Sequence, residues 1–223
     1  NLSDSAHSVG RAHHFETAEQ QYESATLGMW AFIVQEILFF GGLFGAYVVY
    51  RNMYIDAFSA ASHQLDEMVG GYNTAILICS SLTMALAVRC AQKGEKNTVI
   101  GWIVATIVFG FGFLGVKYVE YSAKWNDNLV PTSSFLWDKP EYAHVAGGQV
   151  KIFFSLYFVM TGMHALHMFI GVGIMLWLIA KIRLNQINEH YFTPVEITGL
   201  YWHFVDIVWI FLFPLLYLIG KEG

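Results

Sequence analysis

Five long apolar segments constrain the fold of this chain more than any other feature of its sequence. Each reaches the roughly 20 residues that an α-helix needs to cross about 30 Å of hydrocarbon. The segments lie near Leu27–Tyr50, Val69–Cys90, Val99–Val119, Val150–Ile182 and Val195–Ile219. Backbone N–H and C=O groups in lipid have no water to bond to, so they must form hydrogen bonds with one another within a helix. The sequence therefore predicts an all-α, polytopic membrane helix bundle with five transmembrane helices.

The composition agrees with a membrane protein of one domain. The chain is 56% hydrophobic and only 13% charged, about half the charged fraction of a typical soluble domain. Residues 1–24 contain histidines and acids but no apolar core of a secretory leader, so we expect a polar, solvated N-terminal tail. Residues 25–223 carry no repeat or long linker, and we expect them to form a single five-helix transmembrane domain.

Small residues mark the expected contacts between helices. Gly41 and Gly45 form a GxxxG motif in the first apolar segment. The third segment contains Gly110, Gly112 and Gly115, and the fourth contains Gly171 and Gly173. Glycine lets helix backbones approach closely in lipid. We expect neighbouring helices to touch at these positions.

Basic residues favour one orientation of the bundle. Arg89, Lys93 and Lys96 cluster in one short connection, and Lys181 and Arg183 flank the fourth apolar segment. Cytoplasmic loops are enriched in Lys and Arg, so these ends are expected to lie inside. That places the N-terminus inside and the C-terminus outside, although each side carries six Lys and Arg in total.

One carboxylate, Glu36, lies in the middle of the first apolar segment. It stands about ten residues into that segment, or roughly 15 Å of helical rise, near the bilayer midplane. A charge at this depth costs on the order of 3 kcal/mol, so we expect the carboxyl to be protonated. Two roles remain open, a protonic one and a structural hydrogen bond between helices.

Two histidines in the fourth segment, His164 and His167, share a helix face near mid-depth within "MTGMHALHMF". Such a pair could bind a metal or haem. Two nitrogens do not complete such a site, and no Cys or Asp cluster elsewhere supplies the remaining ligands. We expect no metal ligands here but two neutral imidazoles, hydrogen-bonded to adjacent helices.

The last segment carries polar residues at helical spacing, namely Glu196, His203 and Asp206, aligned with Gly199. The simplest interpretation of His203 and Asp206 is a buried hydrogen-bonded pair. Partners in another subunit are equally consistent with the pattern.

Four motifs resemble a known family. The run "YWHFVDIVWIF" is similar to the last-helix signature of subunit III of haem–copper respiratory oxidases, and "TGMHALHMFIGV" to that family's histidine-pair helix. The run "LGMWAFIVQEILFF" resembles its helix with a buried acid, and "FLGVKYVEY" the end of a further helix, where Glu120 and Tyr121 fall on an acidic–aromatic pair. The order and separation of the motifs match as well.

The resemblance implies an accessory subunit with no catalytic residue and no redox metal. In the family, this subunit packs beside the catalytic subunit I, which carries haem and copper, in a complex that also contains subunit II. The complex reduces oxygen to water and translocates protons, and subunit III sustains proton uptake and protects the enzyme during turnover. The implied location is a respiratory membrane, in particular a bacterial plasma membrane, with no nucleic-acid partner.

The resemblance also implies roles for single residues and for lipid. Glu36 falls on the family's buried carboxylate, and Lys181 on a basic position near lipid headgroups, with Arg183 and His190 nearby. Phospholipid binds in a cleft of longer, seven-helix relatives, whose first two helices have no counterpart here. Part of that cleft would therefore be built differently here or by a neighbouring subunit. Ubiquinol oxidases more often place aspartate at the position of Glu36, which favours cytochrome c as electron donor over a quinol.

Two other classes of function are compatible with the polar residues alone. A membrane haem or copper protein would use His164, His167 and His203. A stand-alone transporter or proton channel would use Glu36, Glu196 and Asp206 as relay groups. The sequence shows no inverted repeat of the kind that many transporters contain.

Overall fold

The computed structural model describes residues 17–187 and 191–218, which form long helices and their connections. The α-helices in chain order are α2 (Ala18–Met53), α3 (Ile55–Ser62), α4 (Glu67–Gln92), α5 (Lys96–Asn126), α6 (Gly147–Arg183) and α7 (Thr193–Phe213). A short 3-10 helix, η1 (Pro140–Tyr142), precedes α6, and a π-helical turn, η2 (Pro214–Leu218), continues α7. Within the described ranges, five helices are long and apolar enough to cross a membrane, which confirms the predicted fold class.

The first four spanning helices extend beyond their predicted apolar segments at both ends. The first, α2, has 36 residues and begins at Ala18, inside the stretch expected to be a tail, where the Thr17 side chain caps it by accepting a hydrogen bond from the backbone N–H of Gln20. Such a helix is about 54 Å long, well over the thickness of the hydrocarbon. Its polar first turns therefore project beyond the lipid core, where hydropathy no longer indicates a helix.

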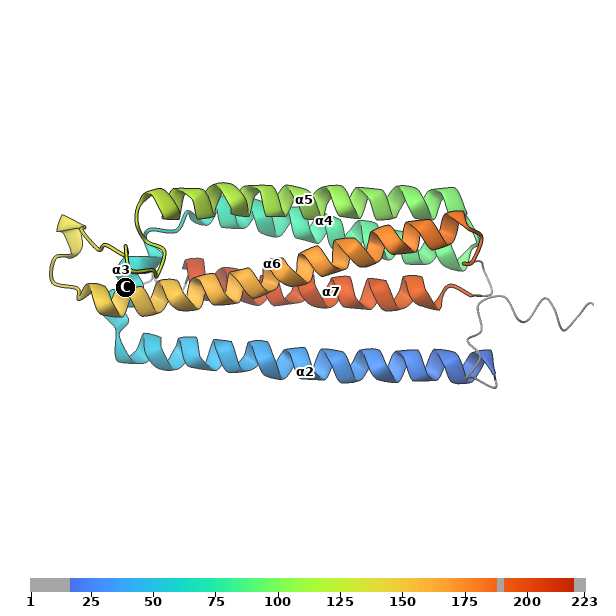
Figure 1. Ribbon diagram of the computed structural model, residues 1–223, viewed down its shortest axis with the longest axis horizontal. Helices are drawn as coiled ribbons and strands as arrows, with labels where there is room; N and C mark the ends of the chain where they lie inside the picture. Colours follow the sequence, from blue (N-terminus) through green and yellow to red (C-terminus); the bar gives the residue numbers. More distant parts are fainter. Residues whose placement is uncertain (1–16, 188–190, 219–223) are drawn as a thin grey trace, which may run out of the picture.

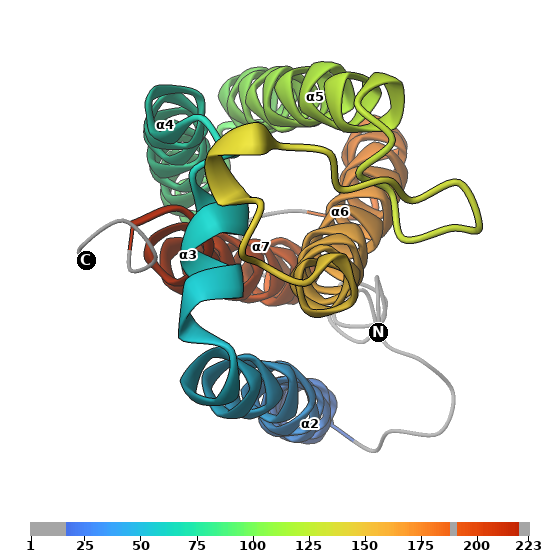
Figure 2. The ribbon, with the colours of Figure 1, turned by 90° about the vertical axis from the view of Figure 1, so that its left-hand side faces the viewer.

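The long helices run side by side along one axis of the molecule (Figure 1). Viewed along that axis, α7 lies among the other helices, with α4 on one side and α2 on the other (Figure 2). The turn from α4 to α5 is short, and Gly94 has φ 74° there, a conformation that glycine adopts without steric cost. These two helices are consequently antiparallel neighbours.

The short helix α3 crosses one end of the bundle between α2 and α4 (Figure 2). Its Phe58 is fully buried, with ring centroids 5.3 Å from Tyr47 of α2 and 5.4 Å from Phe153 of α6. The Asp66 side chain then starts α4 by accepting a hydrogen bond from the backbone N–H of Met68 at 2.9 Å. These contacts connect the end of α2 to the rest of the bundle.

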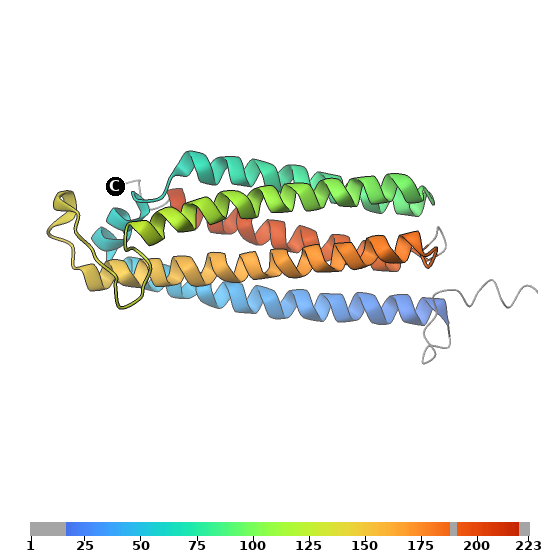
Figure 3. The ribbon, with the colours of Figure 1, turned by 45° about the horizontal axis from the view of Figure 1, so that its top comes forward.

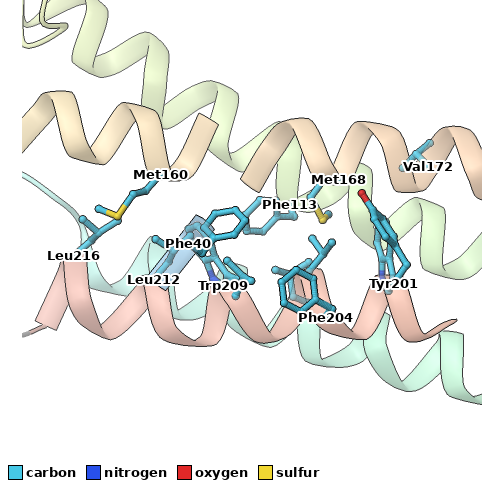
Figure 4. Packing of buried hydrophobic residues seen from close by; sticks show 14 of the residues in the cluster. Phe40, Phe113, Met160, Met168, Val172, Tyr201, Phe204, Trp209, Leu212 and Leu216 are labelled. Carbon is cyan, nitrogen blue, oxygen red and sulfur yellow. The ribbon is translucent and has the colours of Figure 1, made fainter. Parts of the chain in front are cut away.

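Large side chains fill the space between α6 and α7. Figure 4 shows Met160 and Met168 from α6 facing Trp209 and Leu212 from α7. The Trp209 ring meets that of Phe113 edge-on, with centroids 4.7 Å apart. This packing buries α7 more than the other spans. In its most apolar stretch, 56% of the residues are buried.

The indole of Trp202 lies between two glycines in the centre of the bundle. Its ring atoms would be 2.8 Å from a Cβ added to Gly171 and 3.2 Å from one added to Gly110. Its Nε1 donates a hydrogen bond to the Ser80 hydroxyl at 2.9 Å. The expected contacts at Gly110 and Gly171 are therefore confirmed. An added Cβ at Gly112 would only reach ordinary contact, 3.9 Å from Ile76 of α4. At Gly41, Gly45, Gly115 and Gly173 no described neighbour lies within 4 Å of that position, so the close contacts expected there, including those of the GxxxG motif, are not formed.

Replacing Gly171 by alanine tests this packing. The new methyl group would overlap the Trp202 ring, so Gly171→Ala should lower the free energy of unfolding by about 1–3 kcal/mol. Gly173→Ala is the matched control, since nothing lies within 4 Å of its added Cβ. The control should leave stability unchanged or slightly raised, by up to about 1 kcal/mol, through helix propensity. Unfolding of the purified chain in detergent measures both, and equal stability of the two variants would contradict the described contact.

Candidate functional site

Glu36 of α2 meets His167 of α6 about halfway along both helices. Glu36 Oε2 and His167 Nε2 are 3.2 Å apart, and both side chains are about 10% exposed. The approach is close, although it lacks the regular geometry of a hydrogen bond. His167 Nδ1 lies 2.8 Å from the Met163 carbonyl oxygen, which can only accept, so Nδ1 carries a proton. Nε2 is then the nitrogen that gains or loses a proton, and it faces the carboxyl.

The pair is neutral overall in two arrangements. The proton can reside on Glu36, which then donates to an unprotonated Nε2, or on His167, which then donates to a carboxylate. Neither arrangement places an unpaired charge at mid-depth, where such a charge is costly. The ring of Phe40 packs 5.7 Å from the imidazole and the Tyr201 hydroxyl donates to the His167 carbonyl, which holds this part of α6 in place.

His164 does not join this pair. Its ring is fully buried between Phe113 and Trp209, each with its centroid 5.3 Å away, and neither nitrogen has a hydrogen-bond partner among the described residues. Residues three apart on a helix differ in direction by about 60°. This rotation turns His164 toward α5 and α7 while His167 faces α2. The predicted hydrogen bond to another helix is therefore absent at His164.

A second ion pair, Lys117 with Glu120, lies inside the bundle toward the end that α3 covers. Lys117 Nζ is 3.0 Å from Glu120 Oε2 and donates to the hydroxyls of Tyr157 at 3.0 Å and Tyr217 at 2.9 Å. Both tyrosines in turn donate to Glu120 Oε1, at 2.6 Å and 2.5 Å. The side chains of the ion pair are 5% and 9% exposed. Each charge is thus balanced and hydrogen-bonded, which a buried ion pair requires.

This network joins three spans. Its ion pair comes from α5, Tyr157 from α6, and Tyr217 from the π-helical turn η2 after α7. Pro214 has no backbone N–H, so regular helical bonding changes at that residue. Glu120 was expected from the sequence motifs, but its partner Lys117 was not. Lys117 stands three residues before Glu120, and this spacing, which places both on one helix face, could have indicated the ion pair.

The predicted pair of His203 and Asp206 is not formed. His203 Nδ1 instead shares a hydrogen bond with the Ser81 hydroxyl of α4 at 2.7 Å. Asp206 is 2% exposed, and neither of its oxygens makes a hydrogen bond of regular geometry among the described residues. The imidazole turns toward a neighbouring helix, which leaves the carboxyl one turn further along without it.

The remaining predicted residues lie at the end of the bundle where α6 stops. Glu196 is in the first turn of α7 and accepts a hydrogen bond from Gln92 at 3.1 Å. Lys181 Nζ lies 5.3 Å from the ring centroid of Trp177, and Arg183 is in the same last turn of α6. His190 lies outside the described residues.

Metal ligands do not gather in the part of the chain that the structure describes. No group of three or more His, Cys, Asp or Glu there is arranged to hold an ion. His164, His167 and His203 point to different neighbours, so they do not form one ligand set.

Comparison with known proteins decides the family. A family model described as "Cytochrome c oxidase subunit III" matches residues 138–221. The cytochrome c oxidase subunit 3 of Thermostichus vulcanus is 31% identical over 221 residues, which cover 99% of this chain and 100% of the relative. The chain belongs to the haem–copper oxidase subunit III family.

Subunit III relatives of both electron-donor types are similar to this chain. The quinol oxidase subunit 3 of Bacillus subtilis is 28% identical and covers 95% of this chain and 97% of itself. The cytochrome bo(3) ubiquinol oxidase subunit 3 of Pseudomonas aeruginosa is 30% identical and covers 96% of this chain and 93% of itself. Membership confirms the resemblance seen in the motifs and makes this chain a subunit of a terminal oxidase complex, with partner oxidase subunits.

Removing Lys117 tests the buried ion pair. Lys117→Met leaves Glu120 without its counter-charge and should lower the free energy of unfolding by about 3–5 kcal/mol. The double variant Lys117→Met with Glu120→Gln removes both charges and should be more stable than Lys117→Met alone. Detergent unfolding of the two single variants and the double variant measures the coupling. If the two single losses simply add in the double variant, the groups do not interact as described.

Proposed function

We propose that this chain is the non-redox subunit of a proton-pumping oxidase supplied by cytochrome c, and that Glu36 and His167 sustain proton delivery to the catalytic subunit. Haem and copper then belong to that partner, which performs the oxygen chemistry. The observation that carries the proposal is the carboxyl–imidazole contact of 3.2 Å at mid-depth, where one proton has two possible positions. Imidazole and carboxyl side chains are the groups that most often transfer protons in proteins.

The position of the pair suits an effect on a neighbouring subunit. Glu36 and His167 are buried, but the adjacent Ile37, Leu166 and Ile170 are exposed on α2 and α6. The pair therefore lies just beneath the apolar surface of the bundle and not at its centre. A catalytic subunit covering this surface would come within a few residues of the exchangeable proton.

Lipid contact is part of the proposed function. A wholly apolar groove of about 230 Å³ lies between α2 and α7, lined among others by Phe40, Phe44 and Phe204. Its walls suit an acyl chain. Lys181 and Arg183, at one end of the bundle, suit an anionic headgroup through charge-assisted contacts.

The proposed orientation has the N-terminus inside. Two of the six bases counted on the expected outer side are engaged within the bundle, Lys117 in its ion pair and Lys124 in a hydrogen bond to the Gln64 carbonyl. These two do not act as loop charges. Discounting them leaves the excess of Lys and Arg on the expected inner side.

Glu36→Gln tests the protonic role. The amide keeps the shape of the side chain and can still donate to His167, but it cannot release a proton. The oxidase should assemble with normal haem content and then lose activity after fewer turnovers. Oxygen consumption followed to inactivation, together with the haem spectrum of the purified complex, measures both effects.

The matched control is Glu95→Gln, at the exposed turn between α4 and α5, which should change neither property. Failure of the Glu36→Gln complex to assemble would assign Glu36 a structural role. Unchanged turnover in an assembled complex would remove the protonic role.

The electron donor is tested on the intact complex, purified through a tag on this chain. Reduced cytochrome c should support oxygen consumption and ubiquinol should not, since Glu36 occupies the position where quinol-type relatives more often carry aspartate. Turnover with ubiquinol alone would assign the complex to the other donor class.

A further inference from the structure

A second groove opens on the side of the bundle between α4 and α7, which lie next to each other in Figure 2. Its volume is about 410 Å³. Most of its lining is apolar, and Ile78, Leu82 and Ile207 are exposed along it. The polar residues of the lining are Ser81, His203 and Asp206.

The carboxyl of Asp206 lacks sufficient partners among the described residues of its own chain. The Ser81 hydroxyl is near enough to interact with it, but the same hydroxyl lies 2.7 Å from His203 Nδ1. A serine hydroxyl has one proton to donate, so it cannot donate to both groups. Even when it donates to Asp206, one carboxyl oxygen remains without a donor. A buried carboxyl with an unpaired oxygen costs free energy, and a hydrogen-bond partner from outside the chain would remove this cost.

The depth of Asp206 determines the kind of partner. It lies 13 residues after Thr193, where α7 begins, and so is roughly 20 Å along the helix. Ser81 is likewise in the middle of α4. Lipid headgroups do not reach the middle of the hydrocarbon, and acyl chains carry neither a hydrogen-bond donor nor an acceptor. The partner of the carboxyl must therefore be a protein side chain.

We infer that this groove receives a transmembrane helix of a neighbouring oxidase subunit, which places a hydrogen-bonding side chain against Asp206. The exposed aliphatic walls would pack against the apolar residues of that helix, and the hydrogen bond would fix its register. This inference rests on the membership of the chain in a multi-subunit oxidase. It does not depend on the role proposed for Glu36, which lies at the contact of α2 with α6.

Retention of the chain in the complex tests the inference. The oxidase is purified through a tag on its catalytic subunit, and the amount of this chain per haem is followed during washing with detergent. Asp206→Leu should dissociate about fivefold faster, in line with the loss of one interhelical hydrogen bond. Asp206→Asn should be closer to wild type, because its amide oxygen still accepts. The unfolding temperature of the isolated chain in detergent should be no lower for Asp206→Leu than for wild type.

A second variant keeps the carboxyl and fills the groove. Ala85 is exposed within the lining, and Ala85→Trp should hinder docking and speed dissociation. Val108→Trp is the matched control. It adds an indole at an exposed position of α5 that does not line the groove. If Asp206→Leu and Ala85→Trp are both retained as well as Val108→Trp, the inference is overturned.

A photoreactive benzophenone side chain in place of Leu82 identifies the occupant directly. Irradiation of the purified complex should join this position to a transmembrane peptide of another oxidase subunit, found by mass spectrometry. Adducts with lipid alone would mean that acyl chains fill the groove, and they too would overturn the inference.

Discussion

The absence of hydrogen-bond partners in lipid hydrocarbon governs this structure. Polar groups at mid-depth must be matched by other groups of the protein, and most of them are. The Ser80 hydroxyl accepts from Trp202, the Thr83 and Thr106 hydroxyls bond to each other at 2.8 Å, and Lys117 is enclosed by one acid and two tyrosine hydroxyls. Because these partners come from different spans, the matching of polar groups also determines how the helices are placed.

The two buried acid–base pairs differ in the number of positions open to their proton. Lys117 and Glu120 are held by tyrosines that donate to one and accept from the other, so every polar atom of that pair is engaged. Glu36 and His167 have fewer partners, and their contact allows the proton to lie on either group. The first pair has the properties of a structural connection among α5, α6 and the end of α7. The second has the arrangement that the proposed proton exchange requires.

Much of the fold was predictable because hydropathy reports directly on the lipid environment. The five spans and the contacts at Gly110 and Gly171 followed from the sequence, and the family motifs indicated the type of complex. Side-chain partners did not follow, because they depend on the rotation of each helix about its axis. His164 and His167 share a helix yet face different neighbours, and His203 bonds to Ser81 of α4 and not to Asp206 one turn away. Lys117 was not predicted because a lysine near the end of an apolar segment is usually taken to mark the membrane boundary. Its acid and tyrosine partners become evident only in the structure.

The separation of Glu36 and His167 along the chain has a consequence for biosynthesis. About 130 residues lie between them, so α2 leaves the ribosome on the order of 10 s before its partner on α6. During that interval the carboxyl has no imidazole beside it in the membrane. An ionised Glu36 would then stand uncompensated in hydrocarbon, so the nascent helix has to enter the bilayer with this side chain in its neutral form. The histidine therefore joins a carboxyl that is already in the membrane.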